Sequence, residues 1–80
     1  MSPKQKQLLG WYGAFAILLA YALLSLKVIK SDSYIYQVLN LTGAIGIIIE
    51  ALSKGDKQPA FLNIAWALIA LIGIISLIVS

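Results

Sequence analysis

The sequence predicts an all-α integral membrane protein in which three transmembrane helices form an up-down-up bundle. Two observations lead to this prediction. First, the six lysines and three acidic residues all lie outside three uncharged stretches, at 7–26, 33–49 and 58–80. A run of about 20 apolar residues, at about 1.5 Å per helical residue, matches a bilayer hydrocarbon core about 30 Å thick. Second, hydrophobic residues make up 61% of the chain, which exceeds the composition of soluble domains.

The first two spans differ in polarity. The first is expected at about 8–26, where Trp11 and Tyr12 fit the aromatic belt of a membrane interface. The second, at about 34–52, is the least apolar, and its uncharged part makes only about 25 Å of helix. Either the bilayer thins there, or Glu50 lies near an interface and Ala51 and Leu52 complete the span, and we expect the second. The alternative is a proton-coupled carboxylate inside the membrane.

Capping and turn residues separate the spans. Any residue in 31–33 can cap the second helix by accepting a backbone N–H bond. Gly55 is placed to end that helix in the left-handed conformation, and Pro59 falls in the first turn of the third span, at about 59–79. The short connections make consecutive helices neighbours. Residues 1–80 therefore form one transmembrane domain whose termini lie on opposite sides of the membrane.

The composition excludes several kinds of chemistry. The chain has no Cys, His or Arg, so it lacks a thiolate, an imidazole base and the usual transition-metal ligands. We expect no enzyme activity, no cofactor and no metal site. The lysines flank the spans in pairs and do not form one basic face, which argues against nucleic acid as a partner. A cleaved signal peptide is an alternative for the first span, but its apolar run exceeds the usual length of about 7–15 residues.

The predicted location is the cell membrane, as a multi-pass protein. Orientation follows from the lysines, because cytoplasmic loops of membrane proteins carry an excess of positive charge. Four lysines lie on the side of the N-terminus and two on the other side. The count favours a cytoplasmic N-terminus.

Each span carries one stripe of small, aromatic and uncharged polar residues when positions are mapped at about 100° per residue. Within a bilayer such polar groups face protein or a water-filled cavity. The candidate solute-binding residues on these stripes are Asn63, Trp66, Asn40 and Tyr21. Helix packing would produce the same stripes, because asparagines hydrogen-bond across helices and glycines allow close backbone approach. That interpretation is favoured for the glycines, which are Gly10, Gly13, Gly43, Gly46 and Gly73.

The turn before the third span carries Asp56, Pro59 and then Asn63. This arrangement resembles the Asp-x-Pro turn and following asparagine of the SemiSWEET and PQ-loop group of three-helix membrane transporters. The resemblance implies a parallel homodimer in which Asn63 contacts a sugar-like solute in a central cavity. The first span lacks the Pro-Gln pair that acts as a hinge in that group, and the spacing from Pro59 to Asn63 is one residue shorter.

The segment 34–73 also resembles a broader set of small bacterial membrane proteins described as permease-like. The shared pattern is leucine-asparagine, a glycine, a short charged turn, and then asparagine and tryptophan. It covers about half the chain and implies a multi-pass protein of the bacterial inner membrane without indicating a substrate.

From these features we expect a homodimer in the lipid bilayer, because three helices are too few to enclose a pathway. The expected function is a transporter or facilitator of a small neutral polar solute by alternating access. Asn63, Trp66, Asn40 and Tyr21 would line the dimer axis. The alternatives are a non-transporting subunit or scaffold of a larger membrane complex, and a lipid-binding membrane protein.

Overall fold

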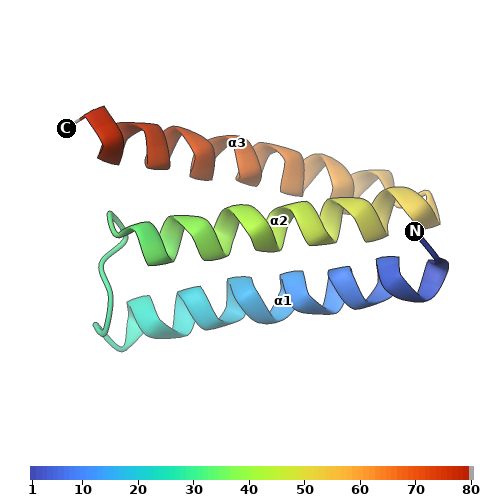
Figure 1. Ribbon diagram of the computed structural model, residues 1–80, viewed down its shortest axis with the longest axis horizontal. Coiled ribbons are helices and arrows are strands. Elements are labelled where there is room, and N and C mark those ends of the chain that lie inside the picture. Colours follow the sequence, from blue (N-terminus) through green and yellow to red (C-terminus); the bar gives the residue numbers. More distant parts are fainter. Residues whose placement is uncertain (80) are drawn as a thin grey trace.

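The computed structural model describes residues 1–79 and contains three α-helices. They are α1 (Pro3–Ser25), α2 (Tyr34–Lys54) and α3 (Lys57–Val79), and each is long and apolar enough to cross a membrane. The helices alternate in direction, and the two termini lie at opposite ends of the molecule (Figure 1). The prediction of an all-α, three-span membrane protein is confirmed.

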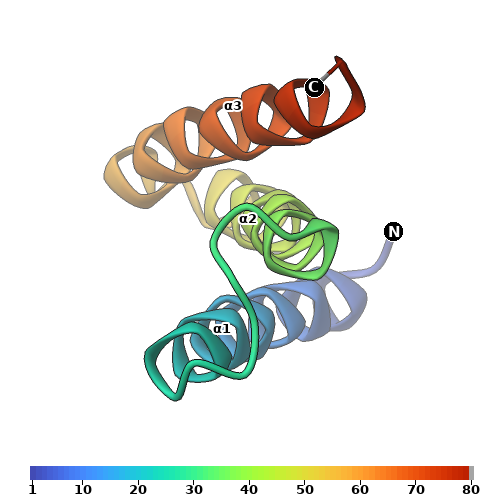
Figure 2. The same ribbon diagram turned by 90° about the vertical axis from the view of Figure 1, so that its left-hand side faces the viewer.

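The helices run up, down and up as neighbours, as predicted, and they form an open row. Helix α2 lies in the middle and packs against both neighbours, whereas α1 and α3 do not contact each other over residues 1–79 (Figure 2). The reason is that α2 carries two small-residue faces. Gly43 and Gly46 face α1, while Ala44 and Ala51 are buried beside the face that bonds to α3. Both neighbours therefore dock on α2.

The ends of α1 reflect two local motifs. Ser2 and Gln5 form a reciprocal capping box that starts the helix, so the polar residues before the first predicted span are helical too. At the other end, the amide of Val28 donates to the carbonyl of Leu23 (2.9 Å), while Lys27 adopts a left-handed φ of 62°. This is a Schellman motif with lysine at the position that usually holds glycine.

The ends of α2 agree with the predicted capping and turn residues. Ser33 caps the helix by accepting a bond from the amide of Tyr36, and Gly55 follows the last turn with a φ of 75°. The amide of Asp56 donates to the carbonyl of Ala51 (2.9 Å), which closes a second Schellman motif. The turn into α3 is accordingly tight.

Glycines bring the backbones of α1 and α2 into direct contact. A Cβ atom at Gly13 would overlap the carbonyl oxygen of Gly43, and one at Gly46 would overlap that of Leu9. Gly10 belongs to the same contact, since a Cβ there would overlap the side chain of Glu50. We call Gly10, Gly13, Gly43 and Gly46 the glycine seam. These four residues are buried and sit where the helices meet, as helix packing in a membrane requires.

Candidate functional site

A groove lined by both polar and apolar residues runs between α2 and α3. Its inner part has a volume of about 290 Å³ and its outer part about 470 Å³, and the two parts share Tyr36 and Gln37. We call the whole the polar groove. Its lining residues are Ser31, Asp32, Tyr36, Gln37, Asn40, Trp66, Ile69, Ala70, Gly73, Ser76 and Leu77.

The inner end of the polar groove is closed by a hydrogen bond between the two helices. The indole Nε1–H of Trp66 donates to Oδ1 of Asn40 (2.9 Å), and Nδ2 of Asn40 donates to the carbonyl of Tyr36 (2.7 Å). Asn40 is only 4% exposed. Such a residue needs partners, because an unsatisfied buried amide costs about 1–3 kcal/mol. The structure thus brings together two of the four predicted site residues.

Asn63 lies one helical turn from Trp66, on the same helix and nearer its start. Its Nδ2 donates to the carbonyl of Pro59 (2.9 Å), a bond within its own helix. Within the described part of the chain, its amide oxygen accepts no hydrogen bond. Asn63 is half-buried and keeps this acceptor free, but it is not among the residues that line the groove.

Tyr21 lies apart from the other three candidates. It belongs to α1, which does not contact α3 among the residues that the structure describes, and its side chain is 64% exposed. A single chain therefore does not assemble the four predicted residues into one site. Tyr21 could face the groove only if another molecule brought the surfaces together.

The sequence-based site left out the outer half of the groove. The Gln37 side chain lies against Gly73, which has room for it only because glycine lacks a Cβ, and Nε2 of Gln37 donates to the carbonyl of Ser31 (3.0 Å). Gln37 precedes Asn40 by three residues, and Gly73 follows Trp66 by seven. At about 100° per residue, these spacings place Gln37 beside the stripe through Asn40 and Gly73 on the stripe through Trp66, so the helical pattern was a signal for both.

The lining indicates which ligands the groove suits. Its inner part offers an amide, a phenol and an indole, and the carboxylate of Asp32 lies only at the outer end. Among the described residues, no cluster of His, Cys, Asp or Glu could hold a metal ion. Several hydrogen-bonding groups between aromatic walls suit a small neutral polar molecule.

Glu50 lies outside the groove, at the opposite end of α2. Its carboxylate is 3.5 Å from the ammonium of Lys54, one turn later on the helix, and its side chain is 21% exposed. A polar pocket beside Glu50 is lined by charged residues from the start of α1 and the end of α2. The site near Glu50 and the polar groove are separate features.

Residues 6–80 match a protein-family model, which covers nearly the whole chain. The chain belongs to this family. No curated protein and no solved structure matches the chain. The match and the three candidate spans identify a small multi-pass membrane protein of the family. The likeness to the SemiSWEET and PQ-loop group gains no support from these comparisons and stays a prediction from the sequence.

Proposed function

We propose that the protein is a homodimeric transporter or facilitator of a small neutral polar solute that works by alternating access. The observation that carries this proposal is the polar groove, which leads from Asp32 at one end of the molecule to the Asn40–Trp66 bond. Its inner part contains no charged side chain, so a neutral solute would avoid the cost of pairing with or burying a charge.

The open row of helices supports the homodimer. The polar groove lies between α2 and α3, away from α1, and the lipid core offers no hydrogen bonds to its polar groups. A second copy would cover the groove and the exposed face of Tyr21. The pathway would then lie between two three-helix units, as in transporters built from paired repeats.

The Asn40–Trp66 bond is the proposed inner gate. A solute hydroxyl or amide reaching Asn40 would donate to the oxygen that Trp66 now occupies, and Asn63 would accept a second bond. Exchange of one hydrogen bond for another costs little, so the indole could move aside without leaving Asn40 unsatisfied. Rocking of the two units would then expose the solute to the other side.

Uptake into proteoliposomes tests the proposal. Asn63→Ala should lower the uptake rate at least about tenfold, as expected for the loss of one solute hydrogen bond in a dry site. Thr42→Val is the matched control, because Thr42 is polar and lies on α2 outside the groove, and it should leave the rate unchanged. Absence of uptake across a broad panel of neutral solutes, or a wild-type rate in Asn63→Ala, would contradict transport.

A second candidate is a non-transporting subunit of a larger membrane complex. Helix α3 supports it, because this helix is the most apolar of the three and exposes most of its side chains. A larger membrane protein could cover that surface. Purification in mild detergent discriminates the two, since the subunit requires a stoichiometric partner and the transporter requires a homodimer.

The proposed location is the bacterial inner membrane, with the N-terminus in the cytoplasm. Four lysines lie at the end of the molecule that holds the N-terminus, and Lys27 and Lys30 lie at the other end. In this orientation the outer end of the polar groove opens toward the outside, because Asp32 shares the connection with Lys27 and Lys30.

A further inference from the structure

A second pocket lies between the start of α1 and the end of α2, at the opposite end of the molecule from Asp32. We call it the interfacial pocket. It has a volume of about 340 Å³ and is lined by Pro3, Lys6, Gln7, Glu50, Ser53 and Lys54. These residues border the uncharged stretches, so the pocket lies at the depth of lipid headgroups.

The interfacial pocket contains charges of both signs whose pairing is incomplete. Glu50 pairs with Lys54 through only one oxygen, Oε2, at a distance of 3.5 Å. The other oxygen, Oε1, lies against the bare backbone of Gly10 and accepts no hydrogen bond within residues 1–79. Lys6 is half-buried and forms no ion pair over the same residues. One acceptor and one cation therefore remain available to a ligand.

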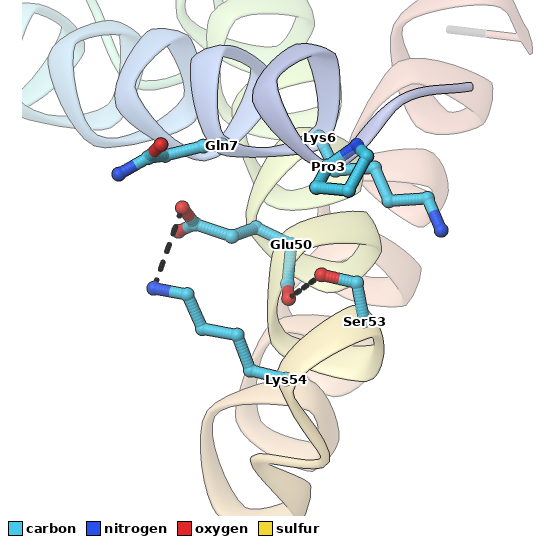
Figure 3. Close-up of a pocket in the computed structure, with 6 residues that line it drawn as sticks. All are labelled: Pro3, Lys6, Gln7, Glu50, Ser53 and Lys54. Atoms are coloured by element: carbon cyan, nitrogen blue, oxygen red, sulfur yellow. Dashed lines mark hydrogen bonds and ion pairs between the residues drawn. The ribbon is translucent and has the colours of Figure 1, made fainter.

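The available groups lie on different sides of the pocket. The Glu50 carboxylate points toward Gln7 and the ammonium of Lys54, whereas Lys6 extends away from it, on the side of Ser53 (Figure 3). The Ser53 hydroxyl donates to the backbone carbonyl of Glu50 (2.7 Å), which leaves its oxygen lone pairs free. A ligand that spans the pocket would meet a cation at one side and a carboxylate at the other.

We propose that the interfacial pocket binds the headgroup of a lipid that carries both a phosphodiester and a primary ammonium, such as phosphatidylethanolamine. The phosphodiester would pair with Lys6. The ammonium would donate to Oε1 of Glu50, which can accept further bonds because a carboxylate offers about four lone-pair sites. A choline headgroup lacks N–H donors, and a glycerol headgroup lacks the positive charge that Glu50 attracts.

Lipid retention by the purified full-length protein tests the proposal. The protein is reconstituted in an equimolar mixture of phosphatidylethanolamine, phosphatidylcholine and phosphatidylglycerol, and retained lipid is measured by native mass spectrometry. The ethanolamine lipid should be retained about tenfold over the choline lipid, as expected for a charge-assisted hydrogen bond. Equal retention of these two, or preferential retention of the glycerol lipid, would overturn the proposal.

Two variants and one control test whether the lipid preference arises at the interfacial pocket. Lys6→Gln should lower retention of the ethanolamine lipid about tenfold. Lys4→Gln is the matched control, because it removes the same charge from the same helix end outside the pocket, and it should stay within about twofold. Glu50→Gln should abolish the preference for ethanolamine over choline. An equal loss in Lys4→Gln and Lys6→Gln, or an unchanged preference in Glu50→Gln, would contradict the assignment.

Soluble phosphoethanolamine carries the same two charged groups without acyl chains. A large excess of it should leave lipid retention unchanged, because the chains anchor the headgroup at the pocket. Displacement of the lipid by the soluble compound would reject the lipid assignment in favour of a water-soluble aminophosphate.

Discussion

Toward α1, helix α2 presents glycines, and toward α3 it presents amide side chains. The glycine seam brings the backbones of α1 and α2 into contact, with a hydrogen bond between Tyr12 and Thr42 at its edge (2.8 Å). The contact with α3 relies instead on the Asn40–Trp66 bond and on Gln37 lying against Gly73. The polar groove is found only at the second contact.

The difference matters because a membrane provides no hydrophobic force to hold apolar helices together. Close packing and hydrogen bonds between helices supply the association. Backbones in contact fit in one arrangement, whereas side chains can change rotamer and exchange hydrogen-bond partners. We therefore expect α1 and α2 to behave as a rigid pair, and α3 to be the helix whose position relative to α2 can change.

The largest expected effect is a substitution in the glycine seam. Gly13→Ile should lower the free energy of unfolding by about 3 kcal/mol, because the added side chain would overlap the Gly43 carbonyl and the Ile47 side chain. Unfolding of the purified protein in mixed micelles with increasing SDS measures this. Ala14→Ile is the control, since Ala14 is the exposed neighbour on the same helix. Equal destabilisation by both would show that the two backbones are not in contact.

Much of the fold follows from the sequence because charge and apolarity change abruptly along it. Gly55 was predicted to end the second helix and Pro59 to fall in the first turn of the third, and the structure agrees at both positions. Capping groups such as Ser33 act over a few residues, so local sequence is enough to predict them.

The arrangement of the helices could not be predicted in the same way. A 100° projection shows which residues share a face, but not which face of another helix it meets. Small-residue faces on all three helices permit a closed bundle or a row. For the same reason Asn40 and Trp66 were predicted as site residues and do meet, while Tyr21, selected on the same grounds, lies on a helix that does not reach α3.

At the contact with α3, Trp66→Phe should lower the free energy of unfolding by about 1 kcal/mol, within the range for hydrogen bonds between membrane helices. The substitution keeps an aromatic ring but leaves Oδ1 of the buried Asn40 without its donor. A double-mutant cycle with Asn40→Ala measures the coupling, again by SDS unfolding. Trp11→Phe is the control, since Trp11 is exposed and its indole forms no hydrogen bond among the described residues. A coupling of zero would contradict the bond.

A smaller effect is expected for Tyr12→Phe, about 0.5 kcal/mol. The Thr42 hydroxyl donates to the Val38 carbonyl (2.8 Å), so its single proton is used and Tyr12 must be the donor in their bond. Loss of the Tyr12 hydroxyl leaves the Thr42 hydroxyl bonded to the Val38 carbonyl, so no hydrogen-bond donor is left without an acceptor. Tyr21→Phe serves as the control for removal of an exposed hydroxyl. If Tyr12→Phe lowers the free energy of unfolding more than Trp66→Phe does, the stronger hydrogen bond of α2 is the one to α1 and not the one to α3.

The smallest expected effect on stability belongs to the one glycine at the contact with α3. In Gly73→Ala the new methyl group would come within 2.7 Å of the Gln37 amide, which is the mobile end of a long side chain and can swing away. We expect a change below about 0.5 kcal/mol in the free energy of unfolding, but a several-fold loss of solute uptake, because the displaced amide would fill the groove. Gly13→Ala should instead lower the free energy of unfolding by about 2 kcal/mol, since the new methyl group would overlap the Gly43 carbonyl, and a backbone carbonyl cannot move aside. If both alanine variants destabilise the protein equally, the two contacts are alike, and α3 is held as rigidly as α1.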